Sequence, residues 1–258
     1  MLTFSRKALV CLQVLVASAA GCSSSSSETS TSAASSSSTG ATAHVYAALV
    51  RATLVDANDL AKAKATHDQI ASGAEQSARA AGDIAHDALL GTTMLDSVPN
   101  EFLAIDRWND EAAMKAFYAD PNVQKGFAPL FAKPPTIEYF VQVPDWVSWG
   151  DMDSGDAFDP YFFHLALGTL ADSDVEKSKA AHDKVATAGK QPSIDAGNVA
   201  HVVYLGTDDS RRFVAVDIWS KGDPIVPFYT SDEFKAAFAP LFSSVTQPVY
   251  QSTDWHQW

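Results

Sequence analysis

The chain has 258 residues, and its 18 Lys and Arg against 31 Asp and Glu give it a formal net charge of −13 at pH 7. Such an acidic surface repels nucleic acid and anionic lipid head groups, so nucleic acid is not expected as a partner. The two cysteines are Cys11 and Cys22, so a folded part that follows them can hold no disulfide, thiol nucleophile or cysteine-based zinc site.

The first 21 residues are typical of an export signal. Arg6 and Lys7 precede a roughly 13-residue apolar stretch, too short to span a bilayer, that ends in small residues before Cys22. The sequence AAGC resembles a bacterial lipobox, with Ala19 where Leu is usual. We therefore expect a lipoprotein signal peptide over residues 1–21 and a lipid on Cys22 that anchors the protein to the membrane. An ordinary cleaved secretory signal is the alternative.

A Ser-rich tract follows the expected lipidation site. Residues 22–42 are dominated by Ser, Thr and Ala, which cannot bury apolar surface, so we expect a flexible tether. Ser23 stands directly after Cys22, where retention on the inner membrane would call for Asp. The expected location is therefore the bacterial cell envelope, with the outer membrane favoured over the inner.

The rest of the chain contains two similar halves. Five short sequences recur in the same order, spaced first by 115 residues, then by 111 and finally by 109. They are KATHD and KAAHD, AGDIAH and AGNVAH, FLAIDRW and FVAVDIW, GFAPLF and AFAPLF, and DWVSW and DWHQW. This series predicts a tandem duplication, with one module over residues 43–150, a second over residues 159–258 and a short acidic linker between them.

Each half has the pattern of a β-α-β-β-α-β unit. For the first, we expect strands over residues 44–54, 84–91, 102–108 and 136–143, a helix capped by Asn58 or Asp59, and a second helical region over 110–131. For the second, we expect strands over residues 161–170, 199–206, 212–219 and 248–253, a helix capped by Ser173 or Asp174, and a second helical region over 231–242. Gly82 and Gly197 are expected to end the first helices. This order predicts an α+β fold of two ferredoxin-like modules.

The pattern FLAIDRW…AFYADPNVQKGFAPLF…W resembles the dimeric α+β barrel superfamily, and most closely its antibiotic-biosynthesis-monooxygenase-like group. The resemblance covers nearly everything after residue 43. It implies that two ferredoxin-like sheets pack on each other as a pseudo-dimer within one chain. It also implies an oxygenase without a cofactor, which deprotonates a phenol or enol so that the carbanion reacts with oxygen. Two α+β domains without a shared barrel are the alternative.

The hairpins of the two modules place a His opposite an Asp. If Gly91 pairs with Glu101, His86 lies opposite Asp106. The second hairpin has a different loop, and if Gly206 pairs with Arg212, His201 lies opposite Asp217. An Asp that orients an imidazole makes it a competent base near neutral pH. The candidate catalytic residues are therefore His86, Asp106, His201 and Asp217. A structural pair that only fixes each hairpin is the alternative, and no metal is expected from one His per module.

Strand alternation places Phe102, Ala104, Asp106 and Trp108 on one face, which we expect to line the space between the two sheets. The residues expected to bind a small apolar or aromatic ligand are Trp108, Trp219, Phe102, Phe213, Tyr118 and Tyr229. An ordinary core is the alternative for this set. His67 and His182 lie on the apolar stripes of the first helices and are expected to pack under the sheets, with a ligand contact inside the barrel as the alternative. Phe127, Leu130 and Phe131, with their repeats, are expected in the core.

These patterns predict a lipid-anchored envelope protein that is a cofactor-independent oxygenase for a small aromatic or quinol compound. One alternative is a protein that binds an apolar ligand without transforming it. Another is a structural envelope protein whose barrel is packed solid. The sequence contains no nucleophile elbow, phosphate loop, dinucleotide fingerprint or zinc signature.

Overall fold

The structure of the protein is a computed structural model that describes residues 44–258. The expected signal peptide, lipidated Cys22 and tether lie outside the described residues. Among the described helices, none has the length and apolar content that crossing a bilayer requires.

The described chain contains two successive sets of elements in the expected order. The first module consists of β1 (Tyr46–Thr53), α1 (Leu60–Ala81), β2 (Asp83–Leu95), β3 (Glu101–Trp108), α2 (Glu111–Ala119), α3 (Pro121–Phe127) and β4 (Thr136–Gln142). A short 3₁₀ helix, η1 (Met152–Gly155), lies in the linker. The second module consists of β5 (Phe162–Leu170), α4 (Val175–Ala196), β6 (Asn198–Gly206), β7 (Arg212–Trp219), α5 (Ile225–Thr230), α6 (Asp232–Phe238), η2 (Ala239–Leu241), β8 (Phe242–Thr246) and β9 (Pro248–Ser252).

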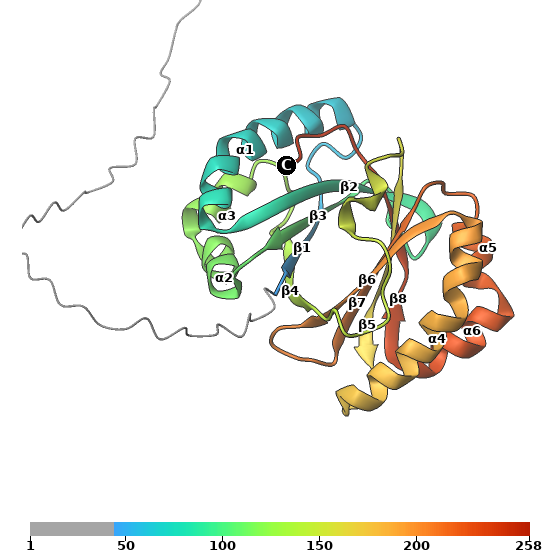
Figure 1. Ribbon diagram of the computed structural model, residues 1–258. Helices are drawn as coiled ribbons and strands as arrows, with labels where there is room; N and C mark the ends of the chain where they lie inside the picture. The colour runs from blue at the N-terminus through green and yellow to red at the C-terminus, as the bar shows by residue number, and fades with distance from the viewer. Residues whose placement is uncertain (1–43) are drawn as a thin grey trace, which may run out of the picture. The chain divides into compact units, whose positions relative to one another are not determined.

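The two sheets join edge to edge and close into one antiparallel barrel (Figure 1). The first module has the strand order β4-β1-β3-β2, and the second has β9-β5-β7-β6. Pairing of β4 with β6 and of β2 with β9 links the modules at both edges. Eight described strands therefore form a closed ring without a free edge, which confirms the intramolecular α+β barrel and excludes two separate domains.

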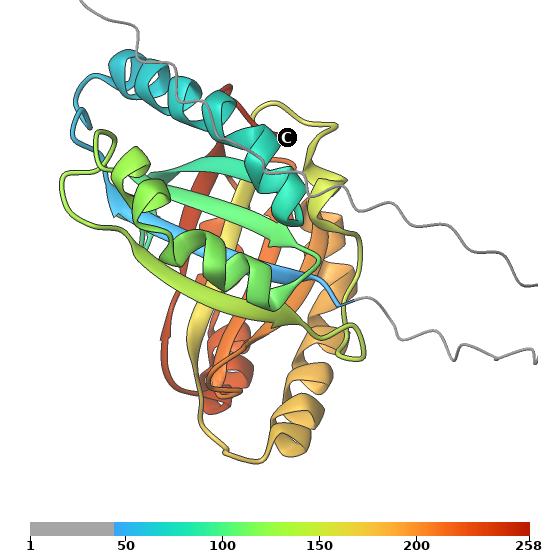
Figure 2. The same cartoon turned by 90° about the vertical axis from the view of Figure 1, so that its left-hand side faces the viewer.

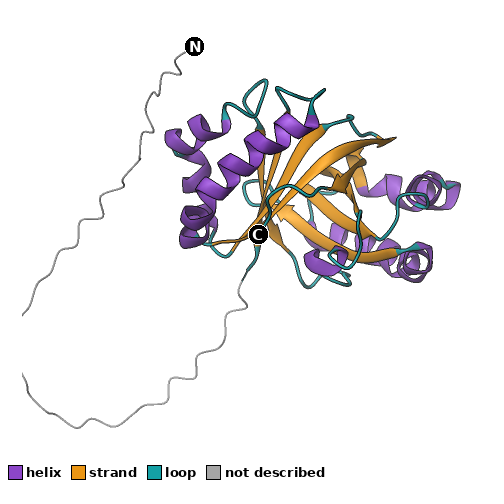
Figure 3. Cartoon of the chain, turned by 90° about the horizontal axis from the view of Figure 1, so that it is seen from above, coloured by secondary structure: helices purple, strands orange, loops and turns teal. Residues whose placement is uncertain are grey.

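The helices lie outside the barrel. Seen from above, the helices of the two modules cover opposite sides of the strands (Figure 3). A quarter turn from Figure 1 brings α1, α2 and α3 in front of the first sheet (Figure 2). Each long helix begins and ends where the sequence predicts. Asp59 and Asp174 accept hydrogen bonds from the first-turn amides, and Gly82 and Gly197 end the helices in the left-handed conformation at φ 111° and 113°.

The expected orientation of the third strands is wrong. Leu103 and Ile105 point into the barrel, where they join a continuous aliphatic and aromatic core, whereas Phe102, Ala104 and Trp108 pack against the helices. The alternation was correct, but it does not distinguish an inner from an outer face when both are buried. The barrel interior is filled with side chains, and cavities lie instead between each sheet and its helices.

The second helical region of the second module also differs from the expectation. It begins at Ile225 rather than at residue 231, and Phe242 belongs to β8 rather than to a helix. Ser231 is extended and caps α6, so it divides the region into two short helices. Pro240 lies in η2, where the helical run ends.

Candidate functional site

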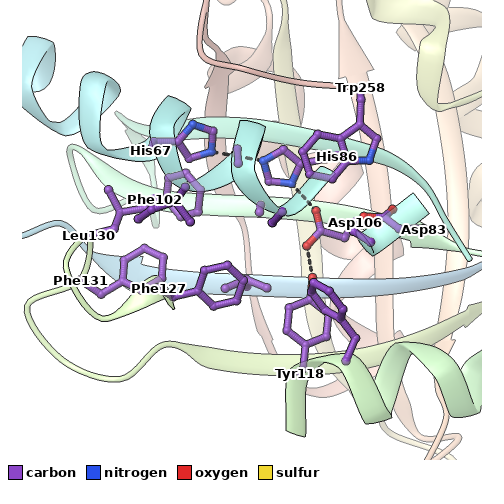
Figure 4. A pocket seen from close by; sticks show the side chains of 17 residues that line it. His67, Asp83, His86, Phe102, Asp106, Tyr118, Phe127, Leu130, Phe131 and Trp258 are labelled. Carbon is purple, nitrogen blue, oxygen red and sulfur yellow. Dashed lines mark hydrogen bonds and ion pairs between the residues drawn. The ribbon is translucent and has the colours of Figure 1, made fainter. Parts of the chain in front are cut away.

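A cavity of about 50 Å³ lies between the first sheet and its helices (Figure 4). Its apolar wall includes Phe102, Phe127 and Leu130. Its polar wall comes from α1, β2, β3 and α2 and consists of His67, Asp83, His86, Asp106 and Tyr118. Five titratable groups therefore line one small and mostly apolar space, which is the usual composition of a functional site.

The predicted His–Asp register is confirmed. His86 on β2 lies opposite Asp106 on β3, and its Nδ1 bonds to Oδ1 of Asp106. The other oxygen of Asp106, Oδ2, accepts a hydrogen bond from the Tyr118 hydroxyl on α2. Both carboxylate oxygens are thus engaged, and the carboxylate is held between an imidazole and a phenol.

A second histidine extends this arrangement. His67 is buried under the sheet, as expected, and its Nε2 lies 3.2 Å from Nε2 of His86. Its Nδ1 lies 3.1 Å from Oδ1 of Asp68. The other oxygen of Asp68, Oδ2, accepts a hydrogen bond of 2.7 Å from Lys64 Nζ. The sequence interpretation missed the contact between the histidines. The signal was present, because both modules keep the same 19-residue spacing between the two.

The protonation states of the two histidines follow from their surroundings. Burial, and then the neighbouring charge of His86, lower the pKa of His67 to about 4. Burial also disfavours the charged form of His86, but the adjacent Asp106 outweighs it and raises the pKa of His86. Neutral His67 therefore accepts the Nε2–H of His86 and donates its Nδ1–H to Asp68. The result is a directed chain of hydrogen bonds from the cavity to Asp68, whose side chain is 32 % exposed.

The covering residues of the first cavity come from the end of the second module. Trp258 stacks on the His86 ring at 4.5 Å, and its carbonyl accepts the His86 amide at 2.8 Å. Trp255 lies 5.0 Å from the His67 ring. In the second module, Trp149 and Trp146 from the end of the first module take the corresponding positions. Each module therefore completes the site of the other.

The second module contains the same set of contacts around a cavity of about 70 Å³. His201 Nδ1 lies 2.7 Å from Asp217, and its Nε2 lies 3.2 Å from Nε2 of His182. His182 contacts Asp183 at 3.0 Å, and burial lowers the pKa of His182 to about 4. The predicted pairing of His201 with Asp217 is thus also confirmed.

The titratable groups of the two sites differ at two positions. His164 on β5 contacts Asp217 at 3.2 Å, where the first module has Ala48 opposite Asp106. Burial disfavours ionisation of Asp217, but its two histidines outweigh this and hold its pKa well below the usual value.

The other difference concerns the residue that begins the second strand. In the first module it is Asp83, and burial followed by the charge of Asp106 raises its pKa to about 8. In the second module it is Asn198, whose side-chain oxygen accepts the Trp149 indole at 2.7 Å. The first site therefore holds a carboxylic acid that stays protonated at neutral pH, and the second holds an amide.

The predicted ligand-binding residues fall into two groups. Phe102 and Tyr118 line the first cavity, and Phe213 and Tyr229 line the second. Trp108 and Trp219 line neither cavity and are completely buried in the packing between sheet and helices.

The repeated FAPLF sequence has a larger role than predicted. Phe127, Leu130 and Phe131 were expected to be core residues only, but all three line the first cavity. Phe238 and Leu241 do the same in the second. No group of three or more His, Cys, Asp or Glu suited to a metal ion occurs among residues 44–258.

Comparison with known proteins supports the fold. No protein-family model matches the chain, and no curated protein does. Among solved structures, an anthrone oxidase-like protein shares 14 % identity and a TM-score of 0.54, with 84 % of this chain and 93 % of that chain covered. A protein from Fusobacterium nucleatum subsp. nucleatum, named provisionally as a monooxygenase, shares 10 % identity and a TM-score of 0.54 over 82 % and 94 %. A mutant chlorite dismutase from Candidatus Nitrospira defluvii shares 11 % identity and a TM-score of 0.50 over 81 % and 91 %. These similarities show the dimeric α+β barrel fold.

Proposed function

We propose that the protein is a cofactor-independent oxygenase that acts on a small aromatic compound with an acidic C–H or O–H group. One observation carries this proposal. In both modules, a buried His–Asp pair borders an apolar cavity and is connected through a second histidine to an Asp near the surface. Such an arrangement can take a proton from a bound compound and pass it on.

The geometry suggests how the groups divide this work. Both ring nitrogens of His86 are engaged, one with Asp106 and the other with His67. Each oxygen of Asp106 accepts one hydrogen bond and keeps a second lone pair, so the substrate would meet the pair at Asp106 and Tyr118, which line the cavity. The proton would be held on His86 and would leave through His67. Asp106 and Tyr118 are then the catalytic residues, and His67 is a positioning and relay residue.

The proposed reaction consumes one molecule of oxygen. An activated methylene, R₂CH₂, loses a proton to the His86–Asp106 pair, and the carbanion adds to O₂ and takes up a proton to form R₂CHOOH. Loss of water gives the ketone R₂C=O, so one oxygen atom ends in the product and the other in water. The substrate is oxidised by four electrons, and O₂ is the oxidant.

This mechanism fixes the direction of the pH dependence. The pair can accept a proton only when His86 is neutral, and Asp106 raises the pKa of His86 above its usual value of 6.5. We expect kcat/KM to increase with pH, with a midpoint above 6.5. A rate that decreases over this range would contradict the assignment of the pair as the base.

The neighbours in structure suggest the first compounds to test. One is named as anthrone oxidase-like, and an anthrone has an activated methylene between two aromatic rings. We therefore propose hydroxylated anthrones and related phenols as substrates. A protein that binds such a compound without transforming it is the second candidate, because the hydrogen bonds of both histidines are satisfied within the protein.

Oxygen consumption with a hydroxylated anthrone tests the proposal. We expect turnover, incorporation of one atom from ¹⁸O₂, and a loss of at least about 100-fold in the double variant His86→Gln/His201→Gln. The matched control is His256→Gln, because His256 bonds to Glu75 outside both cavities and should leave the rate unchanged. Retention of the compound without oxygen consumption would favour the binding protein. Equal rates in the double variant and the wild type would refute the proposed role of the pairs.

We also propose that the protein is exported and anchored by a lipid on Cys22, and that its two modules arose by duplication. The sequence supports the first point, and the equivalent hydrogen bonds in the two modules support the second. Replacement of Cys22 by Ser should move the protein from the membrane to the soluble fraction of its host. Persistence of this variant in the membrane fraction would contradict the anchor.

A further inference from the structure

A groove of about 380 Å³ lies on the outer side of the first cavity. It is formed by α3, by Tyr118 from α2 and by the segment that leads from α3 to β4. Tyr118, Phe127 and Phe131 line both the groove and the cavity. These three aromatic side chains therefore form the wall between the two spaces, and a movement of one ring would join them.

Phe127 is the member of this wall that can move most easily. It is the last residue of α3, a helix of seven residues in which none is buried. Its ring lies 6.4 Å from Tyr118 and 6.5 Å from Phe131, which is at the long end of aromatic contacts. A short helix with few buried contacts opens at low free-energy cost, so Phe127 is suited to act as a gate.

In the second module, the stretch that corresponds to the border of this groove is a strand. There, residues 243–246 belong to β8 and pair with β5, from Thr169↔Ser244 to Leu167↔Thr246. The corresponding residues of the first module are 132–135. The amide of Ala132 still bonds to Thr53 on β1, but Pro134 and Pro135 have no N–H with which to continue a ladder. The same stretch of chain is therefore a strand in one module and the border of a groove in the other.

The lining of the groove indicates what it could hold. Its walls are mainly apolar and aromatic, and Gln124 and the exposed Lys133 supply polar groups at its border. Flat aromatic walls favour a planar ligand, and an ammonium group at the border favours a ligand with an acidic substituent.

We propose that this groove is the entrance and outer half of the first site, which alone accepts a planar aromatic compound of two or three fused rings with an acidic group held at Lys133. The inference deepens the proposed function and rests on it for the reaction, but the binding route can be measured separately. The second site, behind β8, would then be restricted to smaller ligands.

Binding of 2-naphthoate to the full-length protein, with benzoate for comparison, tests this route. In stopped-flow tryptophan fluorescence, Phe127→Ala should speed the association of 2-naphthoate by about tenfold, because the gate no longer has to move. Phe238→Ala, at the equivalent position behind β8, should change it less than about twofold. Lys133→Ala should weaken the affinity about three- to fivefold, as expected for an exposed charge pair. Lys125→Ala, on α3 but outside the groove, is the control for Lys133, which lies in the segment after α3.

Several outcomes would overturn the inference. Equal effects of Phe127→Ala and Phe238→Ala on the association rate would show that the groove is not the route. Equal effects of Lys133→Ala and Lys125→Ala on the affinity would show that Lys133 does not hold the acidic group of the ligand. If Phe127→Ala does not fold, the exposed Lys133 still provides the test. Naphthoate binding with the expected variant effects, together with no oxygen consumption on a hydroxylated anthrone, would refute the proposed function and leave the route intact. Oxygen consumption with an unchanged KM in Lys133→Ala would refute the role of the groove and leave the proposed function intact.

Discussion

Replacement of Asp83 by Asn tests the electrostatics of the first cavity. Burial and the charge of Asp106 raise the pKa of Asp83 from 3.8 to about 8. Between these two values the unfolded chain releases a proton that the folded protein retains, so the contribution of Asp83 to the stability of the wild type falls as the pH rises. Asn does not titrate, so the free energy of unfolding of the variant should not decrease with pH for this reason.

The magnitude follows from the size of the shift. Each pH unit between about 4 and 8 should cost the wild type up to about 1.4 kcal/mol relative to Asp83→Asn, or up to about 4 kcal/mol at pH 7. A further contribution of about 1 kcal/mol is expected if the new amide accepts the Trp258 indole. That indole has no partner in the structure, whereas Asn198 accepts the Trp149 indole at 2.7 Å.

The assay is urea unfolding of both proteins at several pH values between 4.5 and 8.5, followed by circular dichroism. We expect the variant to be more stable than the wild type at neutral pH, and the difference to grow with pH and to level off above about pH 8. A difference that is constant over this range, or a wild type that is the more stable at pH 8, would refute the reasoning.

Three further predictions concern the hydrogen-bond chain and its cover. Because burial lowers the pKa of His67 and His182 to about 4, the two histidines should destabilise the fold as the pH falls from 6.5 to 4, by up to about 3 kcal/mol each, and urea unfolding of Asp83→Asn measures this without the opposing titration of Asp83. Tyr118→Phe removes a donor from the buried carboxylate of Asp106 and should cost about 1–3 kcal/mol in the same assay. Trp258→Ala should accelerate hydrogen exchange around the first cavity and leave the second unchanged.

Each of these predictions has a contrary outcome. A stability of Asp83→Asn that is the same at pH 4.5 and 6.5 would mean that burial does not lower the pKa of the two histidines. An unchanged unfolding free energy in Tyr118→Phe would mean that water replaces the phenol without cost. Equal acceleration of exchange in both modules after Trp258→Ala would show that the indole stabilises the whole barrel rather than one site.

Local patterns in the sequence predicted the strands, the helix caps and the His–Asp pairs. The hairpin register is determined by the turn, so His86 could be placed opposite Asp106 before the fold was known. The caps at Asp59 and Gly82 depend only on neighbouring residues and were also predictable. All of these features are formed by residues that lie close together in the sequence.

Features that depend on closure of the barrel could not be predicted in the same way. Both faces of β3 are buried, so alternation left open whether Phe102 or Leu103 points inward. The contact of His67 with His86 requires the packing angle of α1 on the sheet, which sequence spacing does not give. The repeated DWVSW and DWHQW were recognised as a repeat, but only the closed ring brings Trp258 onto a ring of the other module.

The protonation of His67 and His86 is the most direct test of the account, because the proposed base and the relay both depend on it. We would record ¹⁵N NMR spectra of the imidazoles at neutral pH and assign them with His67→Gln and His86→Gln. We predict a neutral His67 that carries its proton on Nδ1, and a His86 whose pKa lies above 6.5. A charged His67, or a His67 protonated on Nε2 while His86 is charged, would contradict a chain directed from the cavity to Asp68.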